Sequence, residues 1–141
     1  MPAAVPSTDG TVAGAMISSP KTLPAATTVA QVRDVFQDDH VHCVLIVDCD
    51  VLLTVVERPD MVEASPEQPA ASLGRLRGRT IGPDESLEPV RLFMLGHRRR
   101  RLAVVDSRRT LLGLLCLKRT GLGFCSDANV RARAAERESQ G

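Results

Sequence analysis

A run of basic residues beside an apolar stretch is the densest charge in the chain and could bind an anionic ligand. It extends from His97 through Arg98, Arg99, Arg100 and Arg101. Guanidinium groups bind phosphate oxygens in bidentate geometry. Because side chains on an extended chain alternate in direction, Arg99 and Arg101 are expected on one side and the other two arginines on the opposite side. We predict that Arg99 and Arg101 bind phosphate; the alternative is a solvated loop that protects a sheet edge from aggregation.

The composition disfavours nucleic acid as the partner of this basic run. The 141 residues carry a formal net charge of only +1, and their aromatic residues are three phenylalanines. A strong attraction to a phosphate backbone and a platform for stacked bases are therefore both missing. The hydrophobic fraction of 43% and the charged fraction of 25% are typical of a globular protein.

Neither a catalytic nor a metal-binding arrangement can be argued from the order of residues. His40 and His42 are two positions apart and would share one face of a strand, but no third ligand follows at a metal-binding spacing. The segment Gly121-Leu122-Gly123 lacks the third glycine and the lysine of a phosphate-binding loop. We therefore expect neither an enzyme nor a metal site, and we place His42 beside a ligand or at a strand end.

The cysteines and the absence of apolar spans suggest a cellular location. The cysteines form no Cys-x-x-Cys pair and are expected to be free thiols in a reducing compartment; they are Cys43, Cys49, Cys116 and Cys125. No apolar run is long enough to cross a bilayer, and the first residues do not resemble a signal peptide. We expect a cytoplasmic protein with no membrane partner.

Two stretches share a design of two apolar runs separated by a polar turn, which predicts two β-hairpins. The first hairpin runs from Val44 to Val56 with its turn at Cys49 and Asp50, and the second runs from Leu102 to Leu117 with its turn starting at Asp106. A short strand and a helix are expected before each hairpin. The strands are Thr22-Leu23 and Thr80-Ile81; the helices have apolar faces at Val29, Val32, Val35 and Phe36 and at Leu87, Val90, Phe93 and Met94.

The two halves are expected to be copies of one unit. Thr22 to Asp48 aligns without a gap with Thr80 to Asp106, 58 positions later, and one extra residue in the second turn then shifts the register by one. Each copy is too small to bury a core of its own, so the two sheets should pack on each other. A helical turn over Val12 to Ile17 and a short helix over Asp60 to Glu67 are also expected.

Proline positions and composition predict the domain boundaries. We expect a disordered N-terminus over residues 1–10, a first repeat over 11–65 and a linker over 66–73, where Pro66 and Pro69 break regular structure. A second repeat is expected over 74–125, followed by a polar helix or tail over 126–141.

This order of elements resembles a tandem pair of CBS domains, the Bateman module. The resemblance rests on the Met16 segment, the short strands and helices, Leu45-Ile46-Val47-Asp48, Ala103-Val104-Val105-Asp106 and Leu111-Leu112-Gly113-Leu114-Leu115, and it covers about Val12 to Lys118. It implies an α+β fold of two pseudo-twofold βαββα repeats packed sheet to sheet. It also implies a cleft that binds adenosyl ligands and the pairing of two chains into a homodimer.

The resemblance assigns a ribose-binding role to one carboxylate. Family members often carry an Asp six residues after a Gly at the second hairpin strand, and this Asp holds the ribose hydroxyls. Asp60 occupies that position in the first half; its alternative role is to bond nearby backbone amides at a helix start. In the second half Gly113 fits the pattern, but Cys116 and Arg119 do not, so at most one good site per chain is expected.

The expected function is therefore a non-enzymatic regulatory module that needs no cofactor and binds AMP, ADP, ATP or S-adenosylmethionine. The base would enter an apolar slot near Leu23, Val44 and His42, Asp60 would hold the ribose, and Arg99 and Arg101 would bind phosphate. The alternative is a ligand-free dimerisation or protein-interaction module, which the departures from the family pattern at Thr54, Glu57, Cys116 and Arg119 favour.

Overall fold

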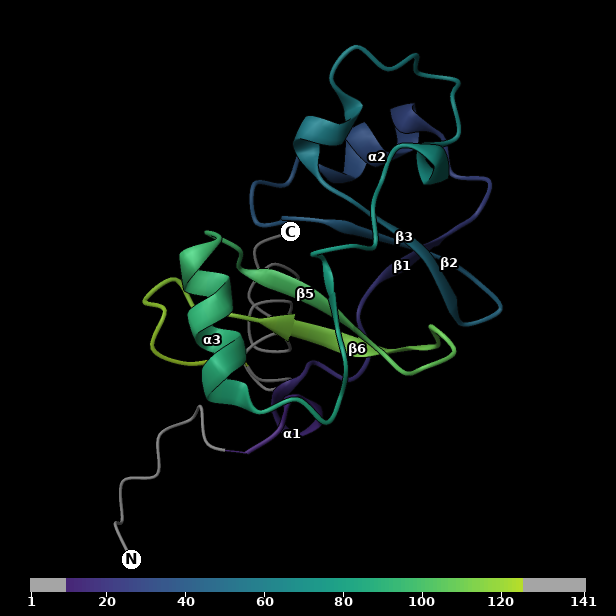
Figure 1. Ribbon diagram of the computed structural model, residues 1–141. Helices are drawn as coiled ribbons and strands as arrows, with labels where there is room; N and C mark the ends of the chain where they lie inside the picture. Colours follow the sequence, from purple (N-terminus) through teal and green to yellow (C-terminus); the bar gives the residue numbers. More distant parts are fainter. Residues whose placement is uncertain (1–9, 126–141) are drawn as a thin grey trace, which may run out of the picture.

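The computed structural model describes residues 10–125, which form two short sheets with few helices (Figure 1). The elements of the first half are α1 (Val12–Ala15), β1 (Thr22–Pro24), α2 (Val29–Val35), β2 (Val44–Asp48), β3 (Val51–Val56) and the 3-10 turns η1 (Arg58–Met61) and η2 (Ala70–Ser72). Those of the second half are β4 (Thr80–Ile81), α3 (Leu87–Gly96), β5 (Arg101–Val105) and β6 (Leu111–Cys116). The expectations for residues 1–9 and 126–141 lie outside the described residues.

The two sheets have the same topology. Their strand orders are β1-β2-β3 and β4-β5-β6, and in each sheet the first pair is parallel and the second antiparallel. Both hairpins are irregular at the same place, between Ile46 and Val47 and between Val104 and Val105. The turn residues Cys49 and Asp50 have positive φ angles of 49° and 67°, which match the twist of a two-residue hairpin turn. Both predicted hairpins are confirmed.

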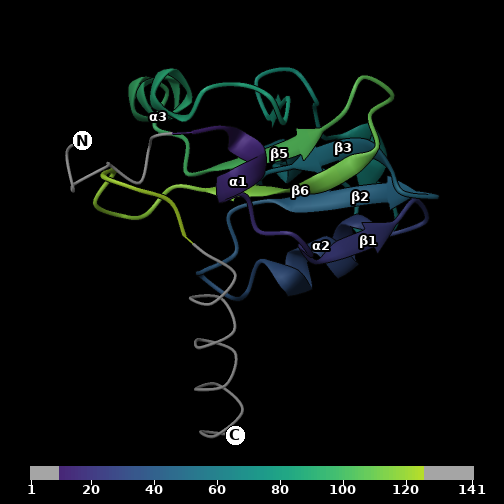
Figure 2. The same cartoon turned by 90° about the horizontal axis from the view of Figure 1, so that it is seen from below.

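The layers follow from where the apolar side chains lie. One buried cluster joins α2 to the first sheet, a second joins α3 to the second sheet, and a third lies between the sheets and includes Leu45, Leu52, Val55 and Ala103. Figure 2 shows the stacked sheets between α3 on one side and α2 on the other. The expectation that the sheets pack on each other is confirmed.

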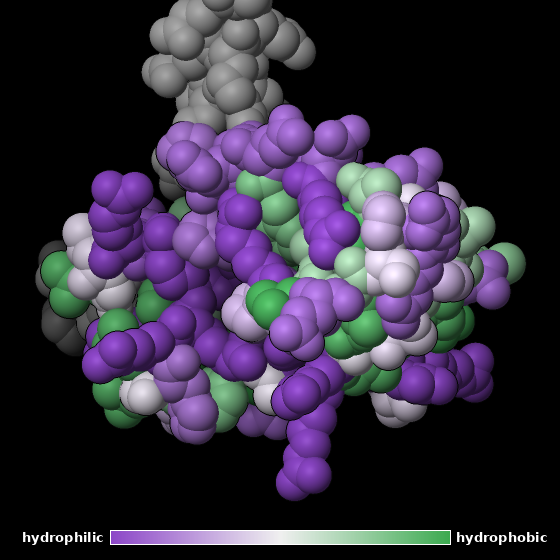
Figure 3. All heavy atoms as spheres, turned by 90° about the horizontal axis from the view of Figure 1, so that it is seen from above, coloured by the Kyte–Doolittle hydropathy of each residue, from purple (hydrophilic) through white to green (hydrophobic). Residues whose placement is uncertain are grey.

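Most of the face shown in Figure 3 is hydrophilic, and its apolar side chains show only in smaller areas between polar ones. This is the expected counterpart of burying the apolar faces of the sheets and helices. Among the described residues, no helix combines the length and the apolar character that crossing a bilayer requires.

The predicted twofold relation appears in the backbone pairing between the halves. Thr11 pairs with Ser86 and Thr28 pairs with Pro69; Thr11 and Pro69 are 58 positions apart, as are Thr28 and Ser86. The backbone amide of Leu52 donates to Arg109, and that of Leu111 donates to Asp50. The pseudo-twofold relates the two bridges to each other and the two amide bonds to each other. The α+β fold of two pseudo-twofold repeats is therefore confirmed.

The repeats exchange short segments. Val12 of α1 is fully buried in the core of the second repeat, and Ala70 of η2 is fully buried in the core of the first. Ala70 falls in the segment predicted to be a linker, so that segment is packed into a core.

The predicted helix over Asp60 to Glu67 is wrong, because only the 3-10 turn η1 forms there. Glu63 has a positive φ of 68°, which no helix accommodates. The Arg33 guanidinium donates to the carbonyls of Met61 and Ala64 and so satisfies groups that a helix would otherwise bond internally.

Candidate functional site

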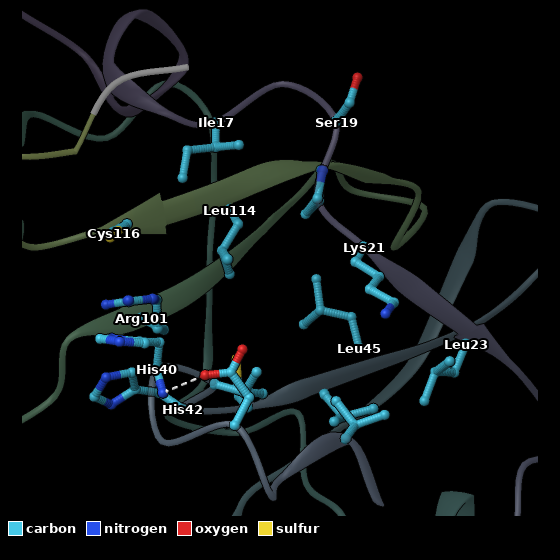
Figure 4. A pocket seen from close by; sticks show the side chains of 16 residues that line it. Ile17, Ser19, Lys21, Leu23, His40, His42, Leu45, Arg101, Leu114 and Cys116 are labelled. Carbon is cyan, nitrogen blue, oxygen red and sulfur yellow. Dashed lines mark hydrogen bonds between the residues drawn. The ribbon is translucent and has the colours of Figure 1, made fainter. Parts of the chain in front are cut away.

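A pocket of about 850 Å³ opens between the two repeats (Figure 4). Its apolar lining comes from both halves: Ile17, Leu23, Val44 and Leu45 belong to the first repeat, and Leu114 belongs to β6 of the second. Ile17 and Leu114 exchange two backbone hydrogen bonds of 2.8 and 3.0 Å across the boundary. A ligand in this pocket would therefore touch both repeats.

Polar side chains surround this apolar lining. Lys21, His40, His42 and Arg101 supply basic groups, and Asp38 is the one carboxylate among the lining residues. Figure 4 shows Arg101 and His40 on one side of the pocket and Lys21 on the other, with Leu45 between them. Apolar walls with a few convergent polar groups are typical of a site for a small organic ligand.

Arg58 positions the loop that carries several lining residues. Its guanidinium donates to the backbone carbonyls of Phe36, Asp38 and Val41 at 2.6, 3.1 and 3.0 Å, and it lies over the Phe36 ring at 4.7 Å. The Asp38 carboxylate in turn accepts a bond from the His40 amide at 2.9 Å. The planar fork of arginine can bond several carbonyls at once, which a lysine could not do in this geometry.

The electrostatics of the pocket favour an anion. Partial burial and then the positive charge of Arg101 lower the pKa of His42 to about 4, with smaller effects from Arg100, Arg58 and His40. The ring is therefore neutral at pH 7 in this structure. An anion bound beside it would offset the neighbouring positive charges and raise that pKa.

The place related to this pocket by the pseudo-twofold holds ion pairs. We call Glu57, Asp60, Arg79 and Arg99 the ion-pair cluster. Arg79 is 7% exposed and donates to both carboxylate oxygens of Asp60 at 2.5 and 3.0 Å, and it lies 3.4 Å from Glu57. Arg99 donates to Glu57 at 2.6 Å.

Asp60 is committed to this cluster. Besides Arg79, its carboxylate accepts a bond from the Glu57 amide at 2.7 Å at the start of η1. Burial alone would raise the pKa of Asp60, but the bonds from Arg79 and Glu57 outweigh it and leave the pKa below its usual value. The bond to a backbone amide, one of the two roles predicted for this side chain, is present in the structure.

A comparison of equivalent positions explains why side chains fill the ion-pair cluster while the pocket stays open. Lys21 is equivalent to Arg79, 58 positions earlier, but the positions equivalent to Glu57 and Asp60 hold Cys116 and Arg119. Lys21 consequently faces no carboxylate pair like that of Arg79, and among residues 10–125 no ion pair involves it. The pocket therefore has an excess of positive charge, whereas the positive and negative charges of the ion-pair cluster balance.

Solved structures resemble the chain over most of its length. The CBS domains of a transcriptional regulator from Streptococcus pneumoniae align with a TM-score of 0.64 and 21% identity, covering 75% of this chain and 92% of that one. The cystathionine β-synthase pair domain of a Shewanella oneidensis protein aligns with a TM-score of 0.68 and 24% identity, covering 90% and 73%. CBSX2 in complex with AMP aligns with a TM-score of 0.64 and 20% identity, covering 91% and 98%. The chain has the fold of a tandem CBS domain pair.

The sequence matches no protein-family model and no curated protein. Its likeness to CBS domain pairs therefore lies in the fold, that is, in the arrangement of its elements. The topology, the sheet packing and the position of the pocket between repeats carry the likeness.

The CBS pair divides the predicted site residues between two places. Leu23, Val44, His42 and Arg101 line the pocket together. Asp60 and Arg99 lie in the ion-pair cluster. Arg101 lines the pocket, whereas Arg99 bonds Glu57 in the ion-pair cluster, so the two side chains that were expected on one side lie in different places.

Three residues that shape this CBS pair were missed from the sequence. Lys21 was overlooked because it is an isolated charge before a short strand, although its alignment with Arg79 was available as a signal. Arg79 and Arg58 gave no signal of their own, because local sequence does not show bonds to distant residues. The partners of Arg79 are 19 to 24 positions away, and those of Arg58 are 17 to 22 positions away. No group of three or more His, Cys, Asp or Glu side chains within residues 10–125 is placed to hold a metal ion.

Proposed function

We propose that this CBS pair is a non-enzymatic regulatory module that binds one adenine nucleotide, or a related adenosyl compound, in the pocket between its repeats. The observation that carries the proposal is the unbalanced charge of that pocket. Lys21, Arg101 and the histidines face a shared space, while the equivalent cluster neutralises Arg79 internally. A phosphate would supply the missing negative charge.

The pocket offers different surfaces to the parts of such a ligand. A purine base fits against Leu23, Val44 and Leu45, and the phosphate fits beside Arg101 and His42, while Lys21 adds its positive charge from the opposite side of the pocket. Asp60 and Arg99 could contribute only if the ion-pair cluster opened, so the proposed ligand is held without them. The AMP complex of CBSX2, which has the same fold, supports this choice of ligand class.

Regulation would follow from the position of the ligand across both repeats. A ligand shifts an equilibrium between two arrangements of the repeats only if it binds one of them more tightly. Arg101 and Leu114 come from the second repeat and the other lining residues named above from the first, so their relative position decides the affinity. We further propose that the module acts as a cytoplasmic homodimer and transmits this change to a regulated protein.

Isothermal titration tests the proposal with AMP, ADP, ATP and S-adenosylmethionine. We expect one ligand per chain and, for Lys21→Met, a loss of affinity of about tenfold, equivalent to about 1.4 kcal/mol. Lys118→Met is the matched control, because Lys118 is exposed and does not line the pocket. Absence of heat at about 1 mM of every ligand, on folded protein, would refute the proposal.

A second candidate is a ligand-free dimerisation or interaction module. The ion-pair cluster favours it, because one of the two related places is already filled by side chains. Exposed apolar residues on and near α3 also favour it; they are Leu92, Phe93, Leu95 and Leu122. Sedimentation with and without AMP separates the candidates: a stable dimer that gives no titration heat supports the interaction module alone.

A further inference from the structure

Two cysteines that the proposed function does not use lie in contact at the edge of the pocket. The sulfur atoms of Cys116 and Cys125 are 2.7 Å apart. The residues are 1% and 7% exposed, and together with Ile17 they form a small buried cluster. Ile17 and Cys116 both line the pocket, so this cluster forms part of its wall (Figure 4).

The backbone holds the two cysteines in register. Beyond β6, Leu117 pairs with Phe124 in antiparallel fashion, and the Lys118 amide donates to the Gly123 carbonyl at 2.8 Å. The Cys125 amide donates to the Cys116 carbonyl at 2.7 Å. The same register places Cys116 directly opposite Cys125. Opposed residues in such a pair have Cβ atoms about 4.5–5.5 Å apart, so the two segments must move slightly closer to reach the Cβ separation of about 3.5–4.5 Å that a disulfide spans.

We propose that Cys116 and Cys125 are a thiol-oxidation site that forms a reversible intrachain disulfide. The sulfurs need to approach by less than 1 Å to reach the bonded distance of about 2.05 Å, and the paired backbone already holds the two residues opposite each other. The other two cysteines are placed differently: Cys49 is exposed in the first hairpin turn, and Cys43 is half-buried directly before β2.

A small disulfide such as oxidised glutathione is the proposed oxidant. The Cys116 thiol loses its proton, and its sulfur attacks one sulfur of the oxidant, which breaks the oxidant's S–S bond and releases one thiolate. The Cys125 thiolate then attacks the Cys116 sulfur and releases the second thiolate. Both released thiolates are protonated, so the protein loses two hydrogens and the oxidant becomes two thiols. Cys116 reacts first because it borders the pocket through which a small molecule can enter.

The proposal goes beyond nucleotide binding, because the disulfide would form whether or not a ligand binds. It would close the short segment between Cys116 and Cys125 and fix the pocket wall at the end of β6. The thiol state of the cell could then alter the same pocket that we propose for the nucleotide.

Peptide mapping of the oxidised full chain tests the proposal without a variant. Folded protein is treated with oxidised glutathione, its remaining thiols are alkylated, and it is digested with trypsin. Residues 110–118 and 120–131 form separate tryptic peptides with one cysteine each, while Cys43 and Cys49 share another. We expect the two single-cysteine peptides to be joined by a reducible link in most chains, with Cys43 and Cys49 outside that link.

Variants and a denatured control make the result specific. Cys125→Ala should remove the link and leave Cys116 carrying glutathione, whereas Cys43→Ser should keep the link. Protein oxidised in urea should give mixed pairings, because the register is then lost. Recovery of alkylated Cys116 and Cys125 from folded wild-type protein, or a Cys43–Cys49 link in its place, would overturn the proposal.

Discussion

At the scale of single residues, the equivalent positions Arg79 and Lys21 differ in their ion pairing, because Arg79 is paired and Lys21 takes part in no ion pair among residues 10–125. Arg79 is almost buried, and an isolated charge there would be very costly to desolvate. Its bonds to Asp60, to Glu57 and to the Val55 carbonyl at 2.8 Å compensate that cost. Burial of an ion pair is roughly neutral for stability, but loss of one partner leaves the other charge buried and unpaired.

Arg79→Ala should therefore lower the free energy of unfolding by about 3–5 kcal/mol, since Asp60 and Glu57 would lose their buried counterion. Urea denaturation at pH 7 measures the change. Arg77→Ala is the matched control two residues away; Arg77 is exposed, and its change should stay within about 0.5 kcal/mol. Equal effects of the two substitutions would contradict the role given to the ion-pair cluster.

His42 gives the CBS pair an acid-sensitive position. Its pKa is about 4 in the folded protein, below the value of about 6.5 that a histidine has in an unfolded chain. Between these values the unfolded state binds more protons, so stability should fall as the pH is lowered from about 6.5 to about 4. The contribution should be on the order of 1 kcal/mol, because solvent at the exposed ring screens part of the effect.

Thermal unfolding of wild type and His42→Gln across that range checks this prediction. The variant should lose less stability than wild type between pH 6.5 and pH 4. His97→Gln is the control, because His97 does not line the pocket and its ring contacts Phe93. Parallel pH profiles for wild type and His42→Gln would mean that His42 does not titrate as described.

The sequence predicted the types of the site residues better than their partners. Leu23, Val44, His42 and Arg101 line one pocket, and the family resemblance, which implies a cleft between the repeats, had placed all four at that cleft. The pairing of Asp60 with Arg79 could not be predicted, because a bidentate bond depends on the packing of segments far apart in the sequence. The motif position of Asp60 gave no indication that the Arg79 guanidinium would bond its carboxylate.

At the scale of elements, two close contacts that the pseudo-twofold relates fix how the repeats meet, and each contact requires a glycine at a different one of the two paired positions. A Cβ atom on Gly113 would lie 2.6 Å from the Ile17 carbonyl oxygen and 2.7 Å from the Met16 sulfur. At the related contact, a Cβ on Gly74 would lie 2.3 Å from the Thr54 hydroxyl. The glycine is on the hairpin strand in one contact and on the incoming segment in the other.

Gly113→Ala should destabilise the CBS pair by about 1–3 kcal/mol, because the Ile17 backbone cannot yield as a flexible side chain could. Gly96→Ala is the matched control: a Cβ there meets nothing within 4 Å, and alanine favours the helix. Chemical denaturation should show Gly96→Ala to be neutral or stabilising. A neutral Gly113→Ala would show that β6 and the Ile17 segment are not held this closely.

Helices and hairpins were predictable where a local signal in the sequence, such as a helix cap or a turn, coincided with tertiary packing. The α2 helix has both, because Thr28 and Gln31 bond each other's backbone amides in a capping box ahead of the buried Val29 and Val32. The segment after Pro59 had the local signal alone. Arg33, some thirty positions earlier, bonds its carbonyls and stabilises a turn in place of the helix.

At the scale of the whole molecule, the two repeats form one folding unit because each completes the core of the other. Val12 belongs by sequence to the first repeat but is buried against Leu87, Val90 and Met94 of the second. Ala70 makes the reverse exchange. The duplicated pattern predicted the twofold relation, but prolines at 66 and 69 indicated only a break in regular structure, and such a break does not imply a break in packing.

Val12→Ala tests this coupling. Removing buried methyl groups from the second core should lower stability by about 2–3 kcal/mol. Because the cores are shared, amide hydrogen exchange should speed up equally in β2 and β3 of the first repeat and in β5 and β6 of the second. Val62→Ala is the same substitution at a site 72% exposed and should change exchange in neither hairpin. If Val12→Ala left β2 and β3 protected while β5 and β6 opened, the repeats would be two independent units, and a ligand between them would have no single arrangement to stabilise.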